Sequence, residues 1–385
     1  MNSDRLKAKR IVCIFGTRPE AIKMAPVVLK LRERRSEFRT DVLVTAQHRG
    51  MLDGVLNLFR IRPRWDLNLM KPGQTLTDVA AGVLRGLDPL LARARPDLVL
   101  VHGDTTTTFA AATAAFHLGI PVGHVEAGLR SGDWANPFPE EMNRRLTDSL
   151  SLLHFAPTRS ARENLLRENA RPRGIFVTGN TGIDALRLGL NLSSQERPLS
   201  GLGVGPIVLI TAHRRENFGT PLLNLCRAVR EAAARRRDAC FVYPVHPNPN
   251  VAGIVRKRLG GLPNVRLTPP MEYGSFIGLL KRAMFVVTDS GGLQEEAPSL
   301  GKPVLVFRKV TERPEAVRAG TVRLVGSEAG DIRRSILSLL EGGTAFRKMA
   351  NAVNPYGDGQ AAERTVQALR HHFGFQVNRP ADFRG

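Results

Sequence analysis

Short apolar runs alternate with longer amphipathic stretches along the whole chain, as in proteins whose helices cover a buried parallel sheet. In the first half of the chain the apolar runs predict strands at residues 11–15, 41–44, 98–101, 122–125 and 175–177. In the second half they predict strands at residues 207–211, 241–244, 265–267, 285–288, 304–307 and 322–325. The sequence therefore predicts an α/β protein with two doubly wound parallel sheets.

The amphipathic stretches between these runs predict helices. Residues 21–34 are expected to form one helix, with Pro19 and Glu20 at its opening turn. Residues 76–95 are expected to form another, and Thr75 is a candidate N-cap because its hydroxyl can accept a bond from the first turn.

The alternation weakens over residues 191–205, where Ser, Pro and Gly crowd together, so a linker is expected there. A length of 385 residues also favours two domains, since domains usually have about 100–200 residues. We expect an N-terminal Rossmann-like domain over residues 9–190 and a C-terminal one over residues 204–362.

The formal charge is +21 and the isoelectric point is near 11.1, which favours anionic partners in general. However, the basic residues are spread in small groups, such as those at 32–35 and 235–237, that fall at expected helix ends. Solvated helix faces explain this distribution better than a nucleic-acid site. We therefore expect no nucleic-acid partner.

Three cysteines, Cys13, Cys226 and Cys240, have no Cys-x-x-Cys spacing and would leave one thiol unpaired in any disulfide scheme. This usage fits a reducing compartment. The apolar run at residues 11–15 is too short for the core of a signal peptide, and nothing in the sequence approaches the length of a membrane span. We expect a cytoplasmic protein without a membrane partner.

Polar residues follow the first predicted strand, at an edge where ligands of doubly wound sheets bind. Gly16 begins a tight turn, and Arg18 and Lys23 lie at the start of the next helix, where a diphosphate would be attracted. The alternative is an ordinary strand-to-helix turn with solvent-facing bases. No second and third glycine follow, so the turn is not a dinucleotide fingerprint and no nicotinamide cofactor is expected.

Three carboxylates are expected at the same edge of the first sheet. Asp104 and Glu126 each follow a predicted strand, and Glu140 starts a helix. Each has a simpler interpretation, because Asp104 could cap a helix and Glu140 could pair with Arg144 four residues later. Together, three acids in one cleft suit opposed proton transfers on a sugar.

The second predicted sheet offers its own polar residues. His213 and His246 each follow a strand, and the alternative is that each is a satisfied loop residue. The run at residues 288–296 is more specific, because it places Ser-Gly-Gly at a helix N-terminus that suits a phosphate, with Glu296 one turn on for a ribose. Arg313 could contact the diphosphate or the preceding helix. No metal-ligand spacing is present, so no catalytic metal is expected.

Taken together, the ordered motifs closely resemble the non-hydrolysing UDP-N-acetylglucosamine 2-epimerases of bacteria, over nearly the whole chain. The motifs are GTRPEA at residues 16–21, TAQH at 45–48, VHGDT at 101–105, GHVEAG at 123–128, DSGG at 289–292, EEAP at 295–298, TERPE at 311–315 and NPYGDG at 354–359.

This resemblance implies the GT-B arrangement, with the active site in the cleft between two Rossmann-like domains and a C-terminal helix and tail, residues 363–385, crossing back to the first domain. It also implies reversible inversion at C2 between UDP-GlcNAc and UDP-ManNAc. In that family UDP is eliminated to leave 2-acetamidoglucal and then returns to the opposite face, without a cofactor. The product would supply surface polysaccharide, and a homodimer activated by UDP-GlcNAc is expected.

Carried over by position, the resemblance assigns roles to particular residues. The acid–base set is Asp104, Glu126 and Glu140. The groups that stabilise or bind UDP are Arg18, Lys23, His213, Phe276, Ser290, Gly291, Gly292, Glu296 and Arg313, while Arg144 would hold the carboxylates or the phosphate. The expected activator site comprises Gln47, Gln74, Arg215 and His246. Asn136 and Gly50 depart from the family pattern and weaken the activator assignment most.

Two other enzymes fit parts of this pattern. A GT-B glycosyltransferase would use the same nucleotide site, but it needs one acceptor-side base where this sequence offers three acids. A hydrolysing epimerase is usually fused to a kinase domain, for which 385 residues leave no room.

Overall fold

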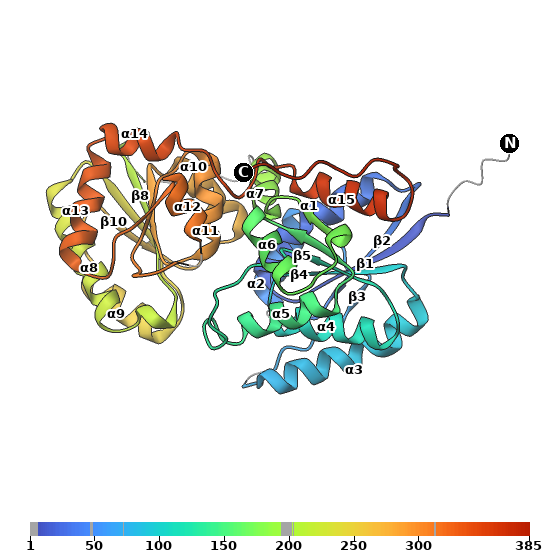
Figure 1. The fold of residues 1–385 in the computed structure, drawn as a ribbon. Coiled ribbons are helices and arrows are strands. Elements are labelled where there is room, and N and C mark those ends of the chain that lie inside the picture. Colours follow the sequence, from blue (N-terminus) through green and yellow to red (C-terminus); the bar gives the residue numbers. More distant parts are fainter. Residues whose placement is uncertain (1–6, 47–48, 72, 194–201, 203, 312) are drawn as a thin grey trace. The chain divides into compact units, whose positions relative to one another are not determined.

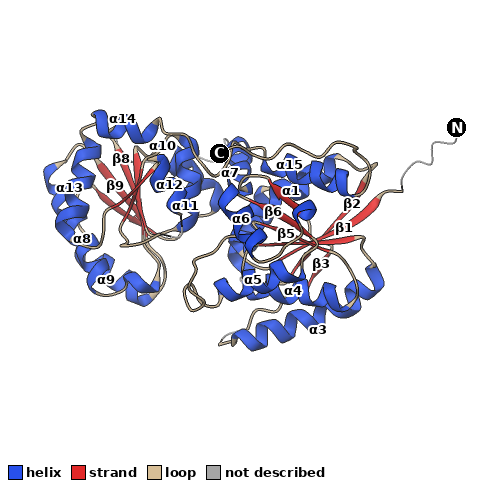
Figure 2. Ribbon diagram, viewed as in Figure 1, coloured by secondary structure: helices blue, strands red, loops and turns tan. Residues whose placement is uncertain are grey.

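The structure is a computed structural model that describes residues 7–46, 49–71, 73–193, 202, 204–311 and 313–385. The chain divides into two compact units, Met1–Leu188 with Tyr356–Gly385, and Gly189–Pro355. Each unit contains one parallel sheet with helices packed on its faces, as the red strands and blue helices of Figure 2 show. The prediction of two Rossmann-like, doubly wound domains is confirmed.

The sheet of the first unit has the order β3-β2-β1-β4-β5-β6-β7 (Figure 1). Its strands are β1 (Lys9–Phe15), β2 (Phe38–Val44), β3 (Trp65–Asp66), β4 (Leu98–His102), β5 (Val122–Val125), β6 (Leu153–Ala156) and β7 (Ile175–Val177). The sequence missed two of them. β3 is too short to give a pattern, and β6 carries a buried histidine, His154, within its apolar run.

The helices of this unit are α1 (Arg18–Glu33), α2 (Arg49–Leu58), α3 (Leu76–Ala94), α4 (Thr106–His117), α5 (Glu140–Leu150), α6 (Arg159–Arg167), α7 (Thr181–Leu192) and α15 (Ala361–His372). The N–H of Asp78 donates to the Thr75 hydroxyl at 3.1 Å, so the predicted cap of α3 is confirmed. α1 begins before the predicted residue 21 because the Glu20 carboxylate accepts the N–H groups of Gly16 and Thr17, at 3.0 and 2.7 Å.

The sheet of the second unit has the order β10-β9-β8-β11-β12-β13. Its strands are β8 (Ile207–Thr211), β9 (Cys240–Pro244), β10 (Val265–Thr268), β11 (Phe285–Thr288), β12 (Val304–Val306) and β13 (Val322–Leu324). All six match predicted runs, because strands buried on both faces are continuously apolar. Its helices are α8 (Thr220–Arg235), α9 (Pro249–Leu259), α10 (Tyr273–Arg282), α11 (Gly291–Glu296), α12 (Pro314–Ala319), α13 (Ala329–Leu340) and α14 (Thr344–Ala350).

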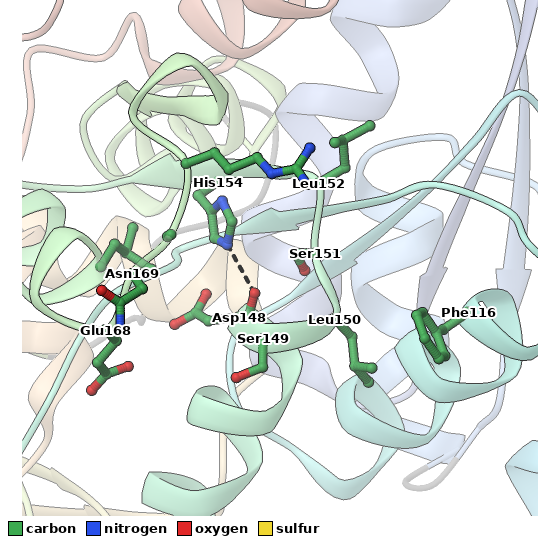
Figure 3. Close-up of a pocket in the computed structure, with 12 residues that line it drawn as sticks. Phe116, Asp148, Ser149, Leu150, Ser151, Leu152, His154, Glu168 and Asn169 are labelled. Atoms are coloured by element: carbon green, nitrogen blue, oxygen red, sulfur yellow. Dashed lines mark hydrogen bonds between the residues drawn. The ribbon is translucent and has the colours of Figure 1, made fainter.

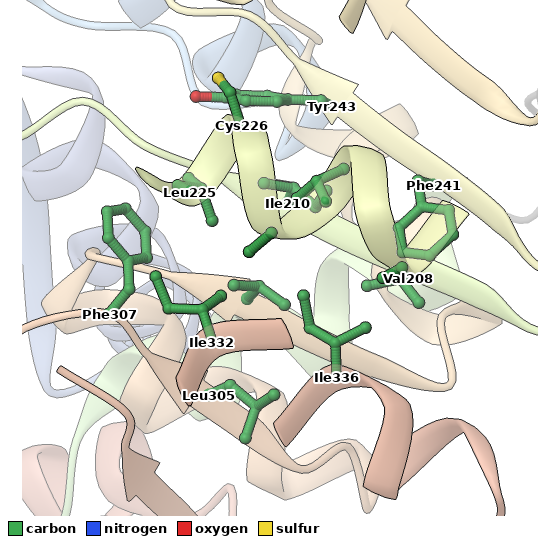
Figure 4. Packing of buried hydrophobic residues seen from close by; sticks show 14 of the residues in the cluster. Val208, Ile210, Leu225, Cys226, Phe241, Tyr243, Leu305, Phe307, Ile332 and Ile336 are labelled. Atoms are coloured by element: carbon green, nitrogen blue, oxygen red, sulfur yellow. The ribbon is translucent and has the colours of Figure 1, made fainter. Parts of the chain in front are cut away.

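The core of the second unit lies between its sheet and the pair α8 and α13 (Figure 4). Val208 and Ile210 of β8 and Leu225 of α8 belong to one buried cluster, and Ile332 and Ile336 of α13 pack in it as well. Burial of such aliphatic side chains stabilises the fold by about 1.5–3 kcal/mol each.

The chain returns to the first unit at Tyr356, earlier than the predicted residue 363. The reason is local bonding, because the N–H of Asn180 donates to the Tyr356 carbonyl at 2.7 Å. Asp184 then accepts the first N–H groups of α15, which packs along α1 (Figure 1). Most of the predicted linker at 191–205 lies outside the described residues. Among the helices that are described, none is long and apolar enough to cross a membrane.

Candidate active site

β1, β4 and β5 are neighbours in the first sheet, and the residues that follow them meet at its carboxyl edge. A cavity of about 400 Å³ opens there. It is lined by the turn after β1, the turn after β4, the residue after β5 and the start of α5. Asp104, Glu126, Glu140 and Lys23 all line it, so the structure brings together the three predicted carboxylates.

Asp104 is held by α5. Arg144 donates from Nη2 to Asp104 Oδ2 at 2.6 Å, and Asn143 donates from its amide to the Asp104 carbonyl at 2.9 Å. The interpretation of Asp104 as a helix cap is wrong, because Thr105 caps α4 by accepting the N–H of Thr108 at 3.1 Å. The Asp104 side chain keeps 30% of its surface exposed and is therefore accessible to a ligand.

Glu126 follows β5 in a left-handed conformation, with φ at 68°. Such a backbone is uncommon outside glycine and often marks a functional position. Lys23 of α1 forms an ion pair with Glu126 Oε2, and the Asn180 amide donates to the same oxygen at 2.8 Å. Both donors therefore contact the same oxygen of the Glu126 carboxylate. Lys23, expected beside a diphosphate, thus contacts one of the acids.

Glu20 joins two turns of the site and was not predicted to have a site role. Besides the turn after β1, its carboxylate accepts the hydroxyls of Thr105 and Thr108, at 2.6 and 2.8 Å. It therefore fixes the turn that carries Asp104. Arg18 is half-buried and its guanidinium lies 3.8 Å from the Met51 sulfur.

His102 is a further residue of the cavity that the sequence left without a role. It is 3% exposed, and neither ring nitrogen has a hydrogen-bond partner among the residues that the structure describes. Its Nε2 lies 3.9 Å from Glu126 Oε2. Burial lowers the pKa of His102 to about 3, outweighing the opposite effect of the Glu126 charge. The imidazole is therefore neutral at physiological pH.

This burial predicts a pH dependence of stability. The pKa of His102 is about 3 in the folded protein and near 6.5 when unfolded, so the unfolded chain binds more protons between these values. The contribution of His102 to the free energy of unfolding is fully present above pH 6.5 and is lost as the pH drops toward 3. Between pH 7 and pH 5 we expect a loss of about 2 kcal/mol from this group.

Chemical unfolding of the wild type and of His102→Gln at both pH values measures this loss. The variant should show a smaller decrease than the wild type, because the other buried histidines are common to both. Equal decreases in the two proteins would refute the assignment.

In the second unit, β8, β9, β11 and β12 are neighbours, and their carboxyl ends carry the predicted nucleotide-binding residues. Asp289 is fully buried and organises them, since it accepts the backbone N–H groups of His213 and Arg214 at 2.9–3.2 Å and the Asn217 amide at 3.0 Å. Burial would raise the pKa of Asp289, but the His213 hydrogen bond and charge outweigh it and lower that pKa. The sequence placed Asp289 in a motif but gave it no role.

The side chain of His213 is exposed. Its ring is stacked with that of His246, and the ring centroids are 6.1 Å apart. Burial and the neighbouring His213 lower the pKa of His246. Ser290 precedes the first turn of α11, and Glu296 one turn later is buried. Phe276 lies half-buried on α10.

Arg313 donates from Nε to the carboxylate of Glu295, which is buried on α11. Of the two interpretations of Arg313, the contact with the preceding helix is therefore the one observed. Only some of the predicted activator residues lie within the described part of the chain. Gln74 donates to the Leu69 carbonyl at 2.7 Å and accepts the Lys71 N–H, whereas Gln47 and the side chain of Arg215 lie outside the described residues.

A second cavity of the first unit, about 500 Å³, is lined by the end of α5, β6 and the segment after α6 (Figure 3). His154 and Asp148 meet in it, where the His154 ring bonds the Asp148 carbonyl at 2.9 Å. None of the predicted site residues lines this cavity. Within the described part of the chain, no group of three His, Cys, Asp or Glu side chains could hold a metal ion.

Comparison with known proteins identifies relatives along nearly the full chain. Residues 30–370 match the family described as UDP-N-acetylglucosamine 2-epimerase. An enzyme of Salmonella typhimurium with that name is 52% identical, over 94% of this chain and 99% of its own. The UDP-GlcNAc 2-epimerase of Neisseria meningitidis, solved with UDP-GlcNAc, superposes with a TM-score of 0.88 at 48% identity, covering 94% of this chain and 99% of its own. The MnaA protein of S. aureus, solved with UDP, gives 0.90 at 44% identity, covering 98% and 100%.

Proposed function

Because the chain belongs to the UDP-N-acetylglucosamine 2-epimerase family, we propose that it interconverts UDP-GlcNAc and UDP-ManNAc by inversion at C2. The observation that carries the proposal is the cavity at the edge of the first sheet, where Asp104, Glu126 and Glu140 meet. Epimerisation needs groups that remove a proton from one face of the sugar and return one to the other, and three carboxylates supply them.

The order of events follows from the acidity of the C2 proton. C2 is not next to a carbonyl, so its proton is acidic only once positive charge develops at C1 as UDP departs. The C1–O bond therefore breaks ahead of proton transfer, a carboxylate takes the C2 proton, and 2-acetamidoglucal and UDP are formed. A proton then returns to C2 from the opposite face, while UDP adds back to C1 on the face that it left, because addition to the other face would change the anomer. The expectation that UDP itself changes face is therefore corrected: the proton does.

The second unit is proposed to bind the UDP. The Ser290, Gly291 and Gly292 amides would stabilise the diphosphate as it leaves. His213, fixed by Asp289, would do the same, and Glu296 would accept the ribose hydroxyls. Phe276 is proposed as an apolar contact of the nucleotide, and Arg18 and Arg313 as cations near it. Lys23 and Arg144 support Glu126 and Asp104 through their ion pairs.

Incubation with UDP-GlcNAc alone in heavy water tests the proposal. We expect deuterium at C2 and formation of UDP-ManNAc, because the C2 proton is exchanged with a carboxylate during each turnover. NMR of C2 and chromatography of the products measure both. A glycosyltransferase would leave the substrate unlabelled without an acceptor, and mainly free ManNAc would indicate a hydrolysing enzyme.

We propose further that the protein acts in the cytoplasm as a homodimer, that UDP-GlcNAc activates it, and that its product feeds surface polysaccharide. Exposed apolar side chains on neighbouring elements of the first unit, Phe116, Leu146 and Leu152, support self-association.

A further inference from the structure

A buried histidine outside the predicted set touches the turn that carries Asp104. His124 of β5 has no exposed surface, and both of its ring nitrogens are bonded. Nε2 lies 2.7 Å from the Gly103 carbonyl, and Nδ1 lies 2.6 Å from Asp148 Oδ1.

The ring of His124 lies between two oxygen acceptors. A carbonyl oxygen only accepts, so Nε2 must carry a proton. Burial would raise the pKa of Asp148, but the charge and hydrogen bond of His124, with the Arg130 charge, outweigh it and lower that pKa to about 2. Asp148 is therefore an ionised acceptor, and Nδ1 of His124 lies within hydrogen-bond distance of it.

Asp148 is itself anchored, so the ring cannot easily rotate. Oδ2 of Asp148 accepts hydrogen bonds from Arg130 Nη2 at 2.7 Å and from the N–H of Gly128 at 3.2 Å. Arg130 also binds Glu168, the residue that directly follows α6. These contacts connect β5, α5 and α6 behind the cavity and hold the imidazole in one orientation.

The Gly103 carbonyl belongs to the peptide group that leads directly into Asp104. Gly103 has φ at +71°, and its N–H donates to the Val125 carbonyl at 3.0 Å. Its φ lies in the region open mainly to glycine, and no atom lies within 4 Å of the place that a Cβ would occupy, so side-chain packing does not restrict this residue. The bond from His124 to the Gly103 carbonyl restricts the rotation of this peptide plane, in addition to the contacts that Asn143 and Arg144 make with Asp104 itself.

We infer that His124, oriented by Asp148, is a positioning residue for Asp104 in the reaction at the first-unit cavity. The inference depends on the proposed function only where it concerns the rate of epimerisation. The position of Asp104 can be measured without any substrate.

Two substitutions at His124 each remove a different one of the two hydrogen bonds that the ring makes. The Gln amide nitrogen occupies the place of Nε2 and the Asn amide nitrogen that of Nδ1. His124→Gln therefore keeps a donor to Gly103, whereas His124→Asn keeps a donor to Asp148 alone. A misplacement of about 1 Å can cost about 10²-fold in rate, so we expect His124→Asn to lower kcat about 10²-fold with little change in KM. His124→Gln should retain kcat within about tenfold.

His154 provides the matched control. It is also a buried histidine of the same sheet, and its Nε2 bonds the Asp148 backbone carbonyl, but it has no bond to Gly103. His154→Asn and His154→Gln should have similar kcat values, because they affect the fold and not the turn. Melting temperatures of all four variants report the structural cost separately.

Crystal structures of both His124 variants measure the position directly. In His124→Gln the Arg144–Asp104 bond should stay near its present 2.6 Å, and in His124→Asn the Gly103–Asp104 peptide should rotate and lengthen it. Unchanged Asp104 geometry in both variants, or kcat values that follow the melting temperatures alone, would overturn the inference. Absence of UDP-ManNAc from the wild type would instead overturn the proposed function, and the crystal structures would still decide the role of His124.

Discussion

Glu126→Gln should lower kcat about 10³-fold while UDP still binds, because a positioned acid or base contributes about 10²–10⁴-fold to a rate. The amide keeps the size of the side chain and can still accept a bond from Asn180, but it cannot take a proton from C2. Most of the proposed UDP-binding groups lie in the second unit, and the substitution leaves Arg18 of the first unit unchanged, so the Kd for UDP should change little. Steady-state kinetics and isothermal titration calorimetry measure the two quantities.

Glu37→Gln is a suitable control for the Glu126 variant. Glu37 also forms an ion pair in the first unit, with Arg370 of α15 at 2.7 Å, but it does not line the cavity. Its kcat should stay near that of the wild type. If Glu126→Gln lost UDP binding along with activity, Glu126 would be a structural residue and not a catalytic one.

The fold could be predicted from the sequence wherever burial leaves a continuous apolar run. β8 and β11 match their predicted bounds because both faces of these strands are covered. β6 was missed although its run, LHFA, has one histidine, His154, just as the predicted run of β5, VGHV, has His124. His154 is tolerated through a bond to the Asp148 backbone, a contact between elements that no local pattern encodes.

The candidate site also contains residues that could be predicted from the sequence and residues that could not. Asp104 and Glu126 could be found because each follows a strand of a parallel sheet, where such residues converge. Their partners could not, since Lys23 reaches Glu126 across 103 positions of the chain and Arg144 reaches Asp104 across 40. Those pairings depend on strand order, which the sequence pattern does not give. The roles of His102 and Asp289 were missed because both depend on burial.

The glycine that follows Glu126 explains part of the GHVEAG motif. Gly128 has φ at +83°, its N–H donates to Asp148 at 3.2 Å, and its carbonyl accepts the Asn164 amide at 2.9 Å. A Cβ at this position would lie 2.8 Å from Leu165 Cγ and would also meet the backbone of Ala161 on α6. Gly128 thus lets α6 approach the end of β5 closely.

Gly128→Ala should therefore destabilise the protein by about 2–5 kcal/mol, the sum of about 1–2 kcal/mol for a side chain in the left-handed region and about 1–3 kcal/mol for overpacking. Gly132→Ala is a matched control, because Gly132 has the same φ of +83° and no atom within 4 Å of the added Cβ. Gly132→Ala should lower the free energy of unfolding by the backbone strain alone, about 1–2 kcal/mol. Urea unfolding of the two variants measures the difference. Equal destabilisation would mean that α6 moves away without cost, so that close packing against Gly128 is not what this position requires.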